Sequence, residues 1–116
     1  MPIRSNLSLC REYLQKYAEK DIEAMTALFS DTIVLRDWKI RVVGKLLALK
    51  ETQKNFDAVS SLDINILETY ENKNTVTAEL KITINGSEEL FVVDVITFNK
   101  EGKIASIRAY LGRGDT

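Results

Sequence analysis

Asp94 is an acidic residue inside an apolar segment, Leu90–Phe98, and so is the first candidate for chemistry. Residues two apart on a strand share a face, and those that share the face of Asp94 are all apolar: Leu90, Val92, Ile96 and Phe98. An apolar environment disfavours the charged form of a carboxyl group. Such a group must therefore find a partner, face a wet cavity or keep its proton. The spacing alone favours a functional acid and a purely structural strand residue equally.

Two other side chains could act together with Asp94. Asp37 ends a predicted strand on the same parity as Ile33 and Leu35, and Tyr13 lies on the apolar face of a predicted helix. Each also has a plain structural explanation, because aspartate commonly ends strands and aromatic residues on apolar helix faces usually belong to the core. Neither residue identifies a site by itself.

The sequence contains no histidine, which excludes a histidine base, a Ser–His pair and a histidine metal site. Acid–base chemistry must come from carboxylates, tyrosines, lysines or bound cofactors. We expect neither a metal site nor a cofactor. The single cysteine, Cys10, falls on the apolar side of the first predicted helix, where a buried and inert thiol is expected.

Composition narrows the range of partners and compartments. The chain has 116 residues, with 16 basic and 17 acidic side chains and a formal net charge of −1. It lacks the basic excess of a nucleic-acid-binding protein, so we expect no nucleic-acid partner. It also lacks a signal-peptide core and any apolar run long enough to span a membrane, which favours a cytoplasmic protein without a membrane partner. The length predicts one domain over residues 1–116.

The predicted elements place helices in the first half of the chain and most strands in the second. Helical spacing predicts a helix over residues 6–19, a second helix that starts at the N-cap Asp21, and a third that follows Gly44 and ends near residue 57. A strand over residues 32–37 could pair with residues 40–43. The remaining strands form a meander. The first alternates at Leu62, Ile64 and Ile66 and leads to a turn near residues 71–74, and the others lie near residues 75–84, 90–98 and 104–111, with a hairpin turn at Asn85-Gly86. This order predicts an α+β cone: a curved, mostly antiparallel sheet packed against three helices.

The identity and spacing of several residues resemble those of the ketosteroid isomerases, which belong to the SnoaL-like, or nuclear-transport-factor-2-like, superfamily. The resemblance extends over nearly the whole chain. The similar residues are Tyr13, Asp21, Phe29-Ser30-Asp31, Asp37, Val93-Asp94, Phe98-Asn99, Gly102-Lys103, Arg108-Ala109 and Gly112. The resemblance implies that Asp37 takes a proton from the carbon beside a carbonyl group and returns it further along the skeleton. It also implies that Tyr13 and protonated Asp94 donate hydrogen bonds to the enolate oxygen.

Two positions depart from that family. Trp38 follows Asp37 where the steroid isomerases have proline, and Thr52 stands about where some members have a supporting tyrosine. The predicted pocket is nonetheless apolar and suits a small hydrophobic ligand or substrate. The residues expected to line it are Trp38, Val92, Ile96, Ile107, Ala109 and Leu111.

The opposite face of the strand that carries Asp94 is apolar as well, with Phe91, Val93 and Val95, and Tyr110 can join them from the next strand. A sheet that is apolar on both faces needs a second covering layer or a partner. The helices are all required on the inner face, so we expect a homodimer through the outer face. The family resemblance implies a dimer too.

Three functions stay open at this point. The leading hypothesis is an isomerase-like enzyme that moves a proton next to the carbonyl of a hydrophobic ketone. A cyclase-like or hydrolase-like SnoaL-like enzyme would keep an acid and would not need Tyr13. The third is a non-catalytic module that binds a small apolar ligand or dimerises, since this fold hosts many functions.

Overall fold

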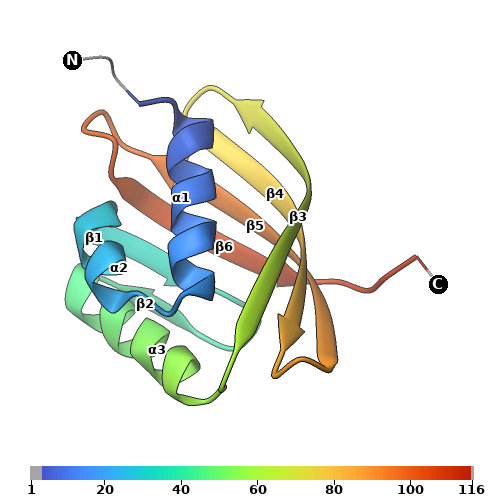
Figure 1. Ribbon diagram of the computed structural model, residues 1–116. Coiled ribbons are helices and arrows are strands. Elements are labelled where there is room, and N and C mark those ends of the chain that lie inside the picture. Colours follow the sequence, from blue (N-terminus) through green and yellow to red (C-terminus); the bar gives the residue numbers. More distant parts are fainter. Residues whose placement is uncertain (1–3, 116) are drawn as a thin grey trace.

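The computed structural model describes residues 4–115, with three helices on one face of a six-stranded sheet (Figure 1). The helices are α1 (Asn6–Ala18), α2 (Ile22–Leu28) and α3 (Lys45–Asp57). The strands are β1 (Phe29–Arg36), β2 (Arg41–Val43), β3 (Leu62–Asn72), β4 (Thr75–Ile84), β5 (Glu88–Phe98) and β6 (Ile104–Leu111). The predicted α+β class, with three helices and a curved sheet, is confirmed.

Side chains at the helix starts satisfy amide groups that have no partner inside the helix. The Ser5 hydroxyl accepts a hydrogen bond of 3.0 Å from the Ser8 amide at the start of α1. The Asp21 carboxylate accepts one of 3.0 Å from the Ala24 amide at the start of α2, as predicted for this N-cap. These two caps fix where α1 and α2 begin, and so where α1 lies over the sheet.

The strands are ordered β2-β1-β6-β5-β4-β3 across the sheet. The pair β1 and β6 is parallel, and all the other neighbouring pairs are antiparallel. The predicted meander is therefore β3 to β6. Its predicted hairpin turn is confirmed, with positive φ at Asn85 (54°) and Gly86 (75°). The parallel pair joins the first part of the chain to the last strand.

One strand differs in extent from the prediction. β1 begins at Phe29 and ends at Arg36, so Asp37 lies just beyond the strand rather than inside it. β3 runs to Asn72, where the turn near residues 71–74 was predicted. An irregularity in its register between Ile66 and Glu68, which was not predicted, shifts the alternation of its side chains.

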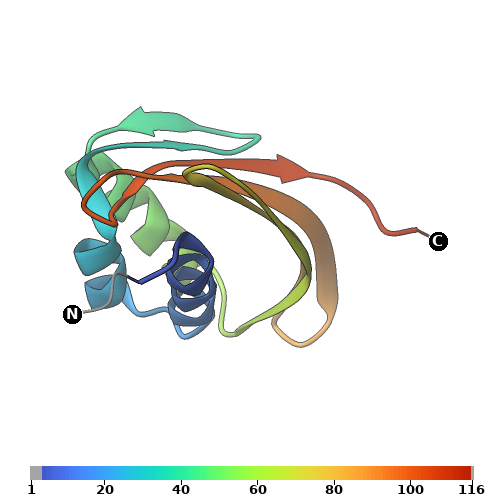
Figure 2. The ribbon, with the colours of Figure 1, turned by 90° about the horizontal axis from the view of Figure 1, so that it is seen from above.

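The core lies between the helices and the concave face of the sheet, which curves around α1 and α3 (Figure 2). Cys10 is fully buried there, as predicted, and burial is the main cause that raises the pKa of its thiol to about 12. The thiol therefore stays protonated near neutral pH. Among the helices of residues 4–115, none combines the length and the apolar character needed to cross a membrane.

Candidate active site

A cavity of about 370 Å³ opens between α1, α3 and the concave face of the sheet. Tyr13 from α1, Asp37 from the end of β1 and Asp94 from β5 all line it. Most of the other lining side chains are apolar, among them Leu14, Leu35, Leu62, Ile64, Leu80, Ile82 and Leu90. The structure therefore brings the three predicted functional residues to one apolar cavity.

Asp94 lies on the inner face of β5 and is 7% exposed. Its direct neighbours across the sheet are Ala78 on β4 and Ala109 on β6, whose small side chains leave room above the carboxyl group. Burial raises the pKa of Asp94 to about 7. At this pKa a substantial fraction of the carboxyl group is protonated at neutral pH. No hydrogen bond within residues 4–115 holds the carboxyl group, so its proton is free to be donated into the cavity.

Tyr13 is 4% exposed, and its ring packs against Phe29 with 6.4 Å between the ring centroids. Burial first, and then the negative charge of Asp94, raise the pKa of Tyr13 well above its ordinary value. The phenol therefore remains a hydrogen-bond donor. Tyr13 and Asp94 are close enough to influence each other, yet no hydrogen bond joins them among the described residues. Both donors are available to a third oxygen atom.

Asp37 starts the turn between β1 and β2 and is held by backbone amides. Its Oδ1 accepts hydrogen bonds from the amides of Lys39 (2.7 Å) and Ile40 (2.9 Å). Its own amide donates to the Ile40 carbonyl oxygen at 2.9 Å. Among residues 4–115, no hydrogen bond reaches the second carboxylate oxygen, which leaves that oxygen free to act as a base. Trp38, which is 44% exposed, forms the tip of this turn and also lines the cavity.

The pocket prediction was wrong for two residues. Trp38, Val92, Ile107 and Ala109 line the cavity, whereas Ile96 and Leu111 do not. Ile96 is fully buried in the hydrophobic core, and Leu111 is 48% exposed at the end of β6. The alternation of side chains predicted the correct face of each strand. It did not show which part of that face lies under a packed helix, which part lines the cavity and which part extends past the cavity.

Thr52, a departure from the resembled family, is buried in the cavity wall. Its hydroxyl donates a 2.8 Å hydrogen bond to the Ala48 carbonyl oxygen inside α3, so the proton of this hydroxyl is already used. Sequence reasoning also missed Tyr17 and Asn55, which line the same cavity. The helical spacing of four between Tyr13 and Tyr17 was an available signal, because such residues share a helix face.

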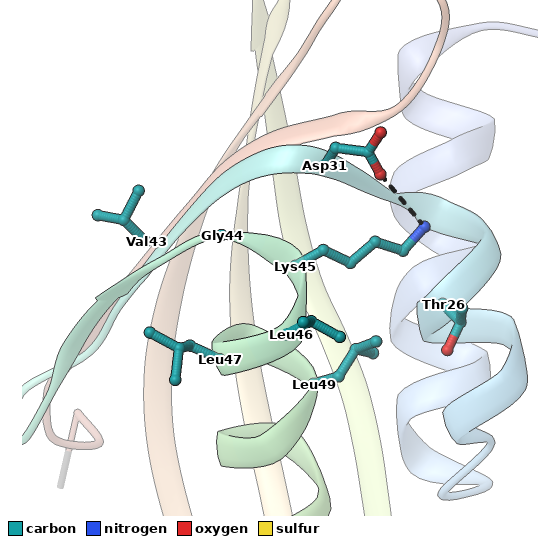
Figure 3. Close-up of a pocket in the computed structure, with 8 residues that line it drawn as sticks. All are labelled: Thr26, Asp31, Val43, Gly44, Lys45, Leu46, Leu47 and Leu49. Atoms are coloured by element: carbon teal, nitrogen blue, oxygen red, sulfur yellow. Dashed lines mark ion pairs between the residues drawn. The ribbon is translucent and has the colours of Figure 1, made fainter.

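A second hollow, of about 550 Å³, lies at the start of α3, away from the predicted residues (Figure 3). Leu46 and Leu47 at its edge are 85% and 51% exposed. Its acid, Asp31, lies 3.9 Å from the Lys45 ammonium group and has a side chain that is 94% exposed. This hollow contains a single, exposed carboxyl group and none of the three predicted functional residues. The cavity that holds Asp94 is therefore the better candidate.

The candidate site contains two carboxyl groups, Asp37 and Asp94, and the phenol of Tyr13. Such a set can remove a proton from a carbon atom and stabilise the negative charge that develops on a neighbouring oxygen. Within residues 4–115, no group of three or more histidine, cysteine or acidic side chains is placed to hold a metal ion.

Comparison with protein families gives a match to the SnoaL-like domain over residues 10–107. No curated protein matches the sequence significantly. Many solved structures have a similar fold. One is an NTF2-like protein of unknown function from Cytophaga hutchinsonii, with a TM-score of 0.80 and 15% identity, covering 97% of this chain and 95% of that one.

Two enzymes of known structure are similar in fold to this chain to about the same degree. An LEH-like epoxide hydrolase from M. tuberculosis has a TM-score of 0.79 and 16% identity, and the match covers 92% of this chain and 82% of that one. The epoxide hydrolase/cyclase-like enzyme SalBIII has a TM-score of 0.80 and 22% identity, with 92% and 90% coverage. At these identities the likeness is one of fold, and the chemistry must be argued from the cavity.

Proposed function

Since this chain belongs to the SnoaL-like domain family, we propose that its cavity catalyses proton transfer next to the carbonyl group of a hydrophobic ketone. The observation that carries the proposal is Asp94, a buried acid with a pKa of about 7, in one cavity with the phenol of Tyr13 and the carboxylate of Asp37. Asp94 keeps its proton in a substantial fraction of molecules near neutral pH, whereas Asp37 accepts hydrogen bonds from backbone amides at the cavity edge. Two carboxyl groups in such different environments suit an acid role and a base role.

In the proposed reaction, the substrate carbonyl oxygen accepts hydrogen bonds from Tyr13 and protonated Asp94. The free oxygen of Asp37 removes a proton from the adjacent carbon, and an enolate forms. The same proton then returns from Asp37 to a carbon further along the conjugated system, so that the double bond shifts and Asp37 is regenerated. The donors stabilise the enolate because they are already fixed where its charge develops.

The direct test is to follow conjugated-enone absorbance after addition of a β,γ-unsaturated ketosteroid. Asp37→Asn should lower kcat by about 100-fold or more, because general base catalysis typically contributes 10²- to 10⁴-fold. Asp31→Asn is a matched control, because Asp31 is an exposed acid on the same strand, outside the cavity. No turnover above background, or equal turnover of wild type and Asp37→Asn, would contradict the proposal.

A second candidate is epoxide opening, which the same pair of carboxyl groups also favours. Protonated Asp94 would donate its proton to the epoxide oxygen as one C–O bond of the ring breaks. Asp37 would take a proton from the water molecule whose oxygen bonds to that carbon, so that a diol forms. Asp37 would then release this proton to solvent, and Asp94 would regain one from it. This reaction has no enolate for Tyr13 to stabilise. Diol formation from cyclohexene oxide that survives in Tyr13→Phe, without enone formation, would favour it. An Asp94 that titrates in NMR like an exposed aspartate, together with no turnover, would favour a non-catalytic module.

We also propose that the chain forms a homodimer through the convex face of the sheet. Three arginines, Arg41, Arg36 and Arg108, stand side by side across β2, β1 and β6. At the other end of the face, Glu68 on β3 is directly opposite Glu79 on β4. Like charges opposite each other destabilise an isolated sheet.

The middle of this convex face is more apolar. Val93 and Val95 lie there half-buried, beside Tyr110, which is 46% exposed. Two copies can pack face to face about a two-fold axis that runs between them, parallel to the strands in this region. This axis would place the glutamates of one copy against the arginines of the other, and would cover the apolar strip. The two charged ends therefore support a second copy of the chain as the partner.

A further inference from the structure

Tyr17 and Asn55 form a polar pair on the cavity wall that the proposed proton transfer does not use. Tyr17 lies one turn after Tyr13 on α1, and Asn55 lies near the end of α3. Tyr17 is half-buried and Asn55 is exposed, whereas Tyr13 is only 4% exposed. The pair is therefore nearer to solvent than the donors Tyr13 and Asp94, at the outer part of the cavity.

Packing and a hydrogen bond hold the Tyr17 phenol in place. Asn55 Nδ2 donates to the Tyr17 hydroxyl oxygen at 3.3 Å. The Tyr17 ring meets the ring of Phe56 edge-on, with 4.9 Å between centroids, and lies 5.8 Å from the ring of Tyr13. Because the oxygen accepts a bond from Asn55, the phenol still has its own proton to donate. Within residues 4–115, no protein acceptor takes that proton.

The electrostatic surroundings keep this phenol neutral. Burial is the main cause that raises the pKa of Tyr17 to about 12, opposed by the Asn55 hydrogen bond and reinforced by the charges of Asp94 and Asp37. When Asp94 is protonated, the carboxylate of Asp37 still makes an anionic ligand oxygen unfavourable at this hydroxyl. A neutral acceptor such as an ether, ketone or hydroxyl oxygen has no such penalty.

We propose that Tyr17, oriented by Asn55, binds a second, neutral oxygen of the ligand. The ligand would then be a hydrophobic ketone with another oxygen about one helical turn, or ~5.4 Å of helix rise, from its carbonyl group. The carbonyl end of this ligand rests on the proposed function, in which Tyr13 and Asp94 bind that oxygen. Tyr17 is in this sense a specificity residue that touches the substrate away from the reacting atoms.

Paired phenolic probes can measure this contact without turnover. The probes are 4-methoxy-1-naphthol and 4-ethyl-1-naphthol, with the corresponding 3-substituted pair. The members of each pair have similar shapes, and only the methoxy compound has a second acceptor oxygen. Isothermal titration calorimetry gives the ratio of the two dissociation constants, ethyl over methoxy, for each protein variant.

Tyr17→Phe should lower this ratio by about 3- to 10-fold for at least one pair, the range expected for one neutral hydrogen bond. Affinity for the ethyl compound should stay the same, because the ring is retained. Asn55→Ala, at an exposed position that tolerates truncation, should lower the ratio less, since the phenol loses its orientation but keeps its proton. Tyr70→Phe, on the convex face, is the matched control and should leave the ratio unchanged.

A ratio that is unchanged in Tyr17→Phe, or a wild-type protein that binds none of the four probes, overturns the inference. A ratio that drops equally in Tyr70→Phe does so as well. The proposed reaction is judged separately, because Asp37→Asn should lower kcat for enone formation by about 100-fold or more and leave the ratio of dissociation constants intact. A Tyr17-dependent ratio without any enone formation would contradict the reaction and keep the second binding contact.

Discussion

At the scale of single residues, Asp94 makes the stability of the protein depend on pH. Its pKa is about 7 in the folded protein, against 3.8 for an aspartate in water. Between these two pH values the folded state binds a proton that the unfolded state has released. The contribution of Asp94 to stability is therefore complete below the unfolded pKa and is lost as the pH rises through the folded pKa, at up to ~1.4 kcal/mol per pH unit.

We expect Asp94→Asn to remove this dependence. The free energy of unfolding of the wild type should fall relative to the variant between pH 4 and pH 7, and the variant should be the more stable protein above pH 7. Urea denaturation of both proteins at pH 4.5, 6, 7 and 8 measures the difference. Asp31→Asn, at an exposed position, is the control and should run parallel to the wild type. Parallel curves for Asp94→Asn would show that its carboxyl group titrates normally.

The same titration should appear in catalysis. As the pH rises through about 7, Asp94 loses the proton that it donates and adds a negative charge beside the developing enolate. We expect kcat/KM for ketosteroid isomerisation to fall over this range in the wild type. Asparagine keeps a neutral donor at all these pH values, so the profile of Asp94→Asn should be lower at acidic pH and flatter. A wild-type profile that stays level from pH 6 to pH 9 would contradict the donor role.

The sequence predicted the residues of the site better than their contacts. Asp94, Asp37 and Tyr13 were found because strand parity and a family resemblance both depend on spacing along the chain. The Asn55 to Tyr17 hydrogen bond joins two helices, so it depends on how α1 packs against α3. Spacing within one helix has no information about that packing. The Thr52 bond is different, because its hydroxyl donates to the carbonyl oxygen of Ala48, four residues earlier in the same helix.

At the scale of elements, the end of α3 is fixed by a lysine from another part of the chain. The Lys20 ammonium group donates hydrogen bonds to the carbonyl oxygens of Phe56 (3.2 Å), Val59 (2.7 Å) and Ser60 (3.4 Å). Carbonyl groups at the end of a helix have no partner inside it, so a cation there satisfies them. Because Val59 also lines the cavity, this contact supports the cavity wall.

We expect Lys20→Ala to lower the free energy of unfolding by about 1–3 kcal/mol, as for other hydrogen bonds to a charged group. Lys20 has a left-handed backbone, with φ of 58°, which glycine adopts without a steric penalty. Lys20→Gly should therefore be less destabilising than Lys20→Ala, although both lose the ammonium group. Denaturant unfolding checks the order, with the exposed Lys100→Ala as the control. Equal stability of Lys20→Ala and the control would show that the contact contributes nothing.

Element types were predictable because their signals are local. Helical spacing, the Asp21 cap and the Asn85-Gly86 turn each depend on a few neighbouring residues. The bulge after Ile66 was not predictable, because it depends on how β3 pairs with β4 and breaks the alternation of side chains. The pairing of β1 with β6 was equally hidden, since it joins segments that are far apart in the sequence.

At the scale of the whole molecule, the two charged ends of the convex face predict a specific response to charge reversal. Glu79→Arg alone and Arg108→Glu alone should each weaken the proposed dimer, because each places like charges together across the two-fold axis. An equimolar mixture of the two variants should form a heterodimer. One of its two charged contacts keeps the original Glu79 and Arg108, and the other is restored with reversed signs. Sedimentation velocity and native mass spectrometry measure the association.

Glu23→Arg provides the control for this experiment, because Glu23 is exposed on α2, on the helical side of the molecule. It should leave association unchanged. A wild type that is monomeric at micromolar concentration would contradict the dimer. Single reversals that leave a dimer intact would show that the copies meet through another surface.

The parallel pairing of β1 with β6 also determines when the cavity can form. Leu35 pairs with Ile107, so the turn that holds Asp37 meets the rest of the sheet only through the last strand. Contacts between distant segments form slowly, because a long loop must close first. During synthesis, α1 to α3 and the hairpin of β1 and β2 emerge long before their partner strand does. The cavity is therefore a late product of folding, and a growing chain lacks the proposed site until β6 has been made.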